Sequence, residues 1–119
     1  MKILIISLFL CLLTVTAFTQ SNLTGTWNTG NQNTLVKIYK QNEYYIGEII
    51  LTENENVKPG TLIMKDVTFN KGKWTGKMYA PQQKEWYNAE LIPVNNKLTI
   101  TVTVGFFSKT IEWTKTKNN

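Results

Sequence analysis

A strict two-residue alternation near the end of the chain most constrains its fold. Leu98, Ile100, Val102 and Val104 are apolar, and a threonine stands between each pair of them. Successive side chains of a β-strand point to opposite faces, so this pattern is typical of a strand with one buried and one solvent-facing side. We therefore expect a half-buried strand over residues 98–104.

The same period of two, rich in β-branched and aromatic residues, runs through the chain from residue 25 onward. The predicted strands cover residues 25–29, 35–40, 44–52, 62–69, 73–79, 85–91, 98–104 and 110–115. Short polar turns between them favour an antiparallel meander, and closure into a barrel removes strand edges that no helix would cover. The sequence thus predicts an all-β protein, a small up-and-down β-barrel of about eight strands. Such a barrel is either filled by side chains or holds one small ligand.

The N-terminus has the form of a cleaved signal peptide. Lys2 precedes an uncharged, mostly apolar run over residues 3–15, and Ala17 and Thr19 have the spacing of a signal-peptidase site. The alternative is a retained membrane anchor, but the apolar stretch, residues 3–18, is shorter than the roughly 20 residues that cross a bilayer.

We expect residues 1–19 to be removed, and Cys11 with them, so that residues 20–119 form a single exported β-barrel domain. The mature protein would be periplasmic or secreted, with no stable membrane anchor after cleavage. A domain of about 100 residues can bury enough apolar surface to fold without disulfides.

The chain contains no histidine and no arginine, and these absences exclude many enzyme classes. Nucleophilic triads need an imidazole base, and most zinc sites use His and Cys ligands. Glu48, Glu90 and Glu112 fall on predicted strands, where carboxylates are usually solvated, and nothing in the sequence pairs them for acid–base chemistry. We expect no catalytic residues, no metal and no cofactor.

The net charge of +5 favours solubility. We expect no nucleic-acid partner, because the basic run 71–79 does not fit a ribonucleoprotein motif.

Six short motifs occur in a fixed order along most of the chain. They are Gly25-Thr26-Trp27, Val36-Lys37-Ile38-Tyr39, Tyr45-Ile46-Gly47-Glu48-Ile49, Gly76-Lys77-Met78-Tyr79-Ala80-Pro81, Tyr87-Asn88-Ala89-Glu90-Leu91 and Glu112-Trp113-Thr114-Lys115. Together they resemble the bacterial secreted family known as domain of unknown function 2147. The resemblance implies the barrel fold and export, and it implies no particular activity. Ala80 and Lys115 depart from the family pattern, which has Asp and Arg at these positions.

The opening Gly25-x-Trp27 also resembles the first strand of a lipocalin. In that superfamily the tryptophan closes one barrel end beneath a cationic side chain from the last strand. The resemblance gives this structural role to Gly25, Trp27 and Lys115, with the lysine stem over the indole.

Aromatic residues on the predicted strands are the main candidates for ligand binding. Tyr45, Tyr79, Tyr87 and Trp113 would line an apolar cavity with phenol and indole groups, if they do not simply fill the core. Our first hypothesis is a non-catalytic barrel that binds a small apolar or amphipathic ligand. The alternative is a filled barrel whose lysines and outward Trp86 bind an envelope glycan or a protein.

Overall fold

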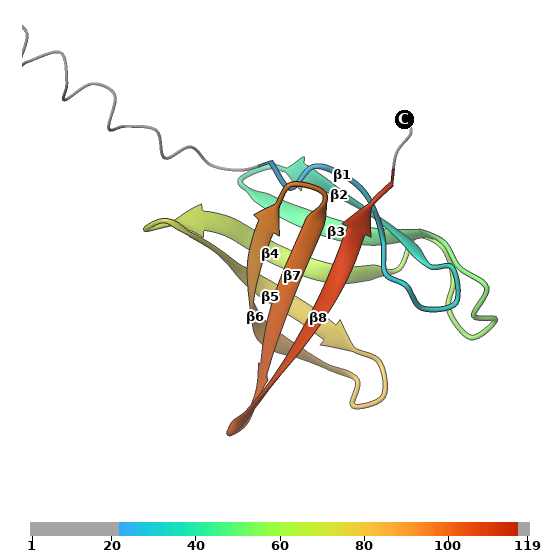
Figure 1. The fold of residues 1–119 in the computed structure, drawn as a ribbon. Coiled ribbons are helices and arrows are strands. Elements are labelled where there is room, and N and C mark those ends of the chain that lie inside the picture. The colour runs from blue at the N-terminus through green and yellow to red at the C-terminus, as the bar shows by residue number, and fades with distance from the viewer. Residues whose placement is uncertain (1–21, 117–119) are drawn as a thin grey trace, which may run out of the picture.

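The computed structural model describes residues 22–116, and the predicted leader, residues 1–19, lies outside the described residues. The chain is all-β, with the strands β1 (Gly25–Asn28), β2 (Leu35–Gln41), β3 (Tyr44–Leu51), β4 (Leu62–Asn70), β5 (Lys73–Ala80), β6 (Glu85–Val94), β7 (Lys97–Val104) and β8 (Phe107–Lys115). Each strand pairs antiparallel with its neighbours in sequence, and β1 pairs with β8 to close the barrel. The predicted small antiparallel barrel of eight strands is confirmed. In Figure 1, β2–β4 cross β7 and β8 steeply, as the two sides of a strongly twisted barrel do.

Tight turns join most neighbouring strands. Between β4 and β5, Lys71 and Gly72 both have positive φ (55° and 80°), which is typical of a type I′ hairpin. Between β7 and β8, Gly105 has a φ of 62° and Phe106 completes a two-residue turn. The turn lets β8 begin at Phe107, so the predicted start at residue 110 was wrong.

Alternate residues of the strands fill the barrel interior. On β7, Leu98 and Ile100 are fully buried while Thr99 and Thr101 face outward, as the period of two predicts. The buried cluster contains three tryptophans and eleven smaller residues: Trp27, Trp74, Trp113, Leu23, Val36, Ile38, Ile49, Met64, Val67, Met78, Ala89, Leu91, Leu98 and Ile100. Residues 22–116 include no helix of the length and apolarity needed to span a membrane.

Candidate functional site

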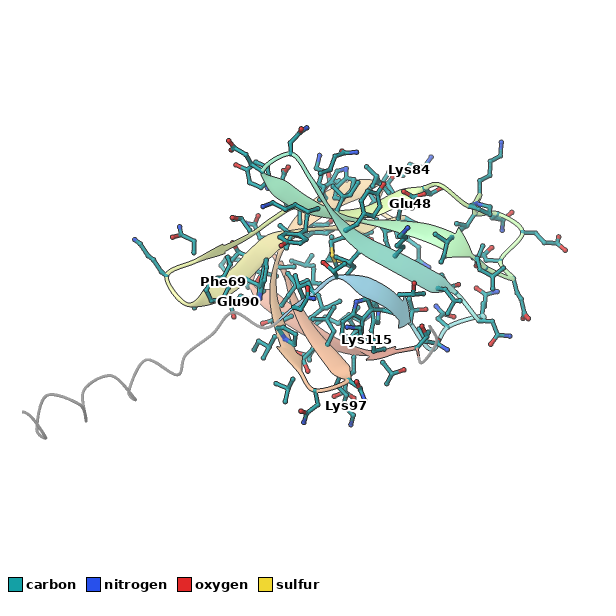
Figure 2. The ribbon with its side chains drawn as sticks, turned by 90° about the horizontal axis from the view of Figure 1, so that it is seen from above. Glu48, Phe69, Lys84, Glu90, Lys97 and Lys115 are labelled. Carbon is teal, nitrogen blue, oxygen red and sulfur yellow. The ribbon has the colours of Figure 1, made fainter. Side chains whose placement is uncertain are left out.

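Gly25, Trp27 and Lys115 come together at one end of the barrel. The Lys115 ammonium lies 5.4 Å from the centre of the Trp27 ring, and Figure 2 shows this lysine beside β1. A Cβ on Gly25 would lie 2.7 Å from the Cε of Lys115, so the glycine leaves room for the lysine stem. The Trp27 indole Nε1 donates a hydrogen bond of 3.0 Å to the carbonyl oxygen of Leu23. The fully buried Trp27 indole and the Lys115 side chain over it thus lie at the end of the barrel where the first strand, β1, begins.

Two of the four predicted ligand-binding aromatics pack in or against the core cluster. Trp113 is 3% exposed and forms part of the core cluster. Tyr45 packs edge-on against Trp74, with ring centres 5.2 Å apart and an angle of 86° between the rings. The buried Nε1 of Trp74 has no hydrogen-bond partner among residues 22–116. Both aromatics therefore act as packing residues in this arrangement.

The other two aromatics lie on opposite faces of the sheet. Tyr87 pairs with Met78, whose side chain points into the barrel. Partial desolvation is the main cause that raises the pKa of the Tyr87 phenol, and the nearby Glu85 is the second cause. Tyr79 pairs with Trp86, 5.2 Å away on the outer face. The structure does not gather the four aromatics around one cavity.

Trp86 points away from the core but is only partly exposed. The ammonium group of Lys65 lies 4.3 Å from the centre of the Trp86 ring, so one side of the indole is covered by a cation. Trp86 thus faces outward as expected, but the side chain of Lys65 reaches from β4 past β5 to lie over it.

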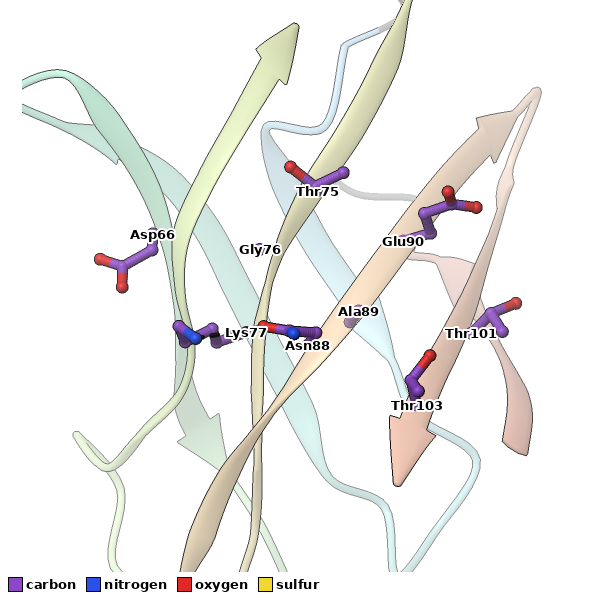
Figure 3. A pocket seen from close by; sticks show the side chains of 9 residues that line it. All are labelled: Asp66, Thr75, Gly76, Lys77, Asn88, Ala89, Glu90, Thr101 and Thr103. Carbon is purple, nitrogen blue, oxygen red and sulfur yellow. Dashed lines mark hydrogen bonds between the residues drawn. The ribbon is translucent and has the colours of Figure 1, made fainter. Parts of the chain in front are cut away.

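A groove of about 590 Å³ crosses the outer face of β4–β7 (Figure 3). Most of its lining side chains are polar and come from the solvent-facing side of the strands. The lining residues are Asp66, Thr75, Gly76, Lys77, Asn88, Ala89, Glu90, Thr101 and Thr103. This volume is within the range of small-molecule sites, although the groove is open to solvent.

Two small residues and a β-bulge lie in the strands beneath the groove. Gly76 pairs with Ala89, and both positions belong to the inner side of the sheet, where Ala89 is part of the core. A Cβ on Gly76 would lie 2.5 Å from Val67 Cγ2 and 3.0 Å from the carbonyl oxygen of Lys65, which shows how closely β4 approaches β5. At Asp66, with a φ of 55°, the β4–β5 register shifts. A bulge of this kind bends a strand and re-aims its side chains.

Hydrogen bonds hold the polar side chains of the groove in place. Lys77 Nζ donates to Asn88 Oδ1 over 3.1 Å, across the β5–β6 pair. At the next outward pair, Glu90 Oε2 accepts a hydrogen bond of 2.9 Å from Lys73, and this bond raises the pKa of the lysine. The groove thus offers ammonium and amide donors, carboxylate acceptors, and threonine hydroxyls that act as either.

The alternation of the strands placed these polar side chains on the outer face, but the sequence did not identify them as a site. The sequence presents Glu90 only as a possible catalytic carboxylate, and nothing in it shows that Thr75, Thr101 and Thr103 lie beside Asn88. Within residues 22–116, no three His, Cys, Asp or Glu residues gather as metal ligands.

A second polar contact lies on the outer face of β2 and β3. The Tyr39 hydroxyl donates a hydrogen bond of 2.7 Å to Glu48 Oε1, and this bond is the main cause that raises the pKa of Tyr39 above its usual value of about 10. Because the neutral phenol is favoured in the folded state, the contact stabilises the fold fully below about pH 10. That stabilisation is lost as the pH rises through the folded pKa.

We expect Glu48→Gln to lower the pKa of Tyr39 toward the usual tyrosine value, because the charge that disfavours the phenolate is removed. The measurement is the tyrosinate absorbance during an alkaline titration, with Tyr39→Phe identifying the contribution of this residue. An unchanged Tyr39 titration in Glu48→Gln would contradict the assignment.

The fold and the groove together define the class of protein: a closed, eight-stranded antiparallel β-barrel with an apolar interior and a polar groove on its outside. The chain belongs to the family described as an uncharacterized protein conserved in bacteria (DUF2147), whose model matches residues 25–115. No curated protein and no solved structure gave a significant match.

Proposed function

We propose that this protein is an exported, non-catalytic module that binds a neutral glycan of the bacterial envelope in the outer groove. The observation that carries the proposal is the groove itself, about 590 Å³ in volume and lined by hydroxyl, amide, ammonium and carboxylate groups. A sugar presents many hydroxyls that both donate and accept hydrogen bonds, and this mixed lining matches them.

The charges of the groove favour a neutral ligand over an anionic one. Asp66 and Glu90 contribute two carboxylates to the lining, and Lys77 together with Lys73, which is bonded to Glu90, offsets them, so the groove has no excess positive charge to attract a polyanion. The Tyr79–Trp86 pair lies one outward position beyond Lys77 and Asn88, at the margin of the groove. Such rings give the apolar face of a sugar an amphipathic surface to contact.

The interior gives less support to a small apolar ligand. Three tryptophans, two methionines and several aliphatic side chains form one continuous cluster inside the barrel. The proposed aromatic contacts for that ligand are divided between the core and the outer face. We therefore favour the filled barrel with an external binding site.

The proposal is tested by titrating the protein with the tetramer of N-acetylglucosamine and with maltotetraose, monitored by NMR. We expect at least one of these sugars to shift the amide signals of Asn88 and Thr101, which lie in the groove. Asn88→Ala removes an amide that pairs with Lys77 and should weaken sugar binding about tenfold.

Thr99→Ala is the matched control, because Thr99 also faces outward on β7 but lies outside the groove lining. It should leave the affinity unchanged. Sugar binding that is insensitive to Asn88→Ala would refute the groove as the site. Failure of both sugars, together with saturable binding of palmitate, would instead favour an apolar ligand inside the barrel.

A further inference from the structure

The last strand is paired on both sides only near its C-terminal end. β7 accompanies β8 from Phe107 to Thr114, whereas β1 pairs with β8 only at Lys115 and Thr114. Within the described part of the chain, residues 107–113 therefore have a strand neighbour on one side alone. An edge of this kind presents backbone N–H and C=O groups to solvent, ready to pair with another extended strand.

The short first strand explains this open edge. β1 ends at Asn28, and the Thr29 amide then donates a hydrogen bond of 3.0 Å to the carbonyl oxygen of Thr34 as the chain turns back into β2. A longer β1 would have continued along β8 toward the β7–β8 hairpin. The turn leaves that position beside residues 108–112 free of any strand of the described chain.

Large apolar side chains are exposed beside the open edge. Phe106 is completely exposed and Phe107 is 77% exposed, at the tip of the β7–β8 hairpin that projects from the barrel in Figure 1. Phe107 lies on the same side of β8 as the buried Trp113, but at the tip no part of the barrel covers it. Two adjacent exposed phenylalanines favour burial in an interface.

We propose that the open edge of β8 pairs with the same edge of a second copy of this chain, around a two-fold axis at Thr110. Antiparallel pairing through such an axis keeps the inner and outer faces of the two strands aligned. Ser108 then lies opposite Glu112 of the second copy, and Lys109 lies opposite its Ile111. The unpaired backbone groups of the two open edges then bond to each other within one continuous sheet. This inference does not depend on glycan binding.

Charge and strand length select this register. A shift of two residues toward the hairpin tip would place Lys109 opposite Lys109 of the second copy, which is unfavourable. A shift in the other direction would require Thr114, which β1 already pairs. In the chosen register Phe107 falls opposite Trp113 of the second copy, on the inner side of the joined sheet. The exposed phenyl ring then lies against the second copy instead of at a free hairpin tip.

A disulfide across the proposed axis tests the pairing directly. Paired Cα atoms in antiparallel strands lie about 4.5–5.5 Å apart, within the range that a disulfide bridges. We expect Thr110→Cys, in a Cys11→Ser background, to form covalent dimers under mild oxidation at least about tenfold faster than Thr103→Cys. Thr103 is the matched control because it is an exposed threonine on the neighbouring β7. Equal rates for the two cysteines would overturn the proposal.

Sedimentation of the unmodified chain provides the second measurement. We expect a concentration-dependent dimer that Phe106→Ser/Phe107→Ser converts to monomer, with an unchanged circular dichroism spectrum because both rings are exposed. A monomer at every concentration would overturn the proposal, as would a dimer indifferent to the double substitution. A monomer that binds vesicles of phosphatidylglycerol and phosphatidylethanolamine through these phenylalanines would also overturn it, and would assign the hairpin tip to a lipid surface.

Discussion

Replacing Trp27 by alanine is expected to lower the free energy of unfolding by about 3–5 kcal/mol, the range for removing a buried tryptophan. Trp27 is fully buried in the core cluster, and its indole Nε1 is bonded to the carbonyl oxygen of Leu23. Alanine would leave a cavity, an unpaired carbonyl and no ring beneath Lys115. Because small domains have only about 5–15 kcal/mol of stability, the variant should be close to unfolding. Urea denaturation followed by tryptophan fluorescence measures the change.

Trp86→Ala is the control for this prediction. It removes the same side chain from the outer face, where the ring is already partly hydrated, and should destabilise the barrel much less. Trp27→Phe should fall between the two, because it retains a ring but loses the donor to Leu23. Similar losses in Trp27→Ala and Trp86→Ala would show that the barrel end does not depend on Trp27.

Gly76→Ala is expected to reduce stability by about 1–3 kcal/mol, the range for overpacking a well-filled core. The added Cβ would lie 2.5 Å from Val67 Cγ2 and 3.0 Å from two backbone atoms, the Lys65 carbonyl oxygen and the Val67 Cα. Since backbone atoms cannot rotate away as a side chain does, β4 and β5 must separate. The separation should also distort the groove, which Gly76 lines.

The neighbouring substitution Thr75→Ala is the matched control, because Thr75 is exposed on the outer side of the same strand. Urea denaturation should show little change for Thr75→Ala and a clear loss for Gly76→Ala. Adding Val67→Ala to Gly76→Ala relieves only the side-chain contact and should not restore stability. A Gly76→Ala variant as stable as the parent would mean that β4 and β5 are not so closely packed.

Two strands are longer than their local sequence predicts. The predicted sixth strand ends at residue 91, two residues before Pro93, yet β6 runs to Val94. Pairing between β5 and β6 ends at Trp74 and Leu91, so at Pro93 the strand has only β7 as a neighbour and loses no bond on the β5 side. The start of β8 at Phe107 similarly depended on the tight Gly105–Phe106 turn.

The sequence by itself determined the family, the number of strands and the face on which most side chains lie, because a period of two follows directly from the pleat of a strand. It also named Gly25, Trp27 and Lys115, which the structure places together. Only the tertiary structure decided that polar side chains from four strands, β4–β7, line one groove, since this depends on how the strands are aligned, including the register shift at Asp66. It alone decided that β1 leaves the edge of β8 open. Both features arise from the register between strands, which no local periodicity specifies.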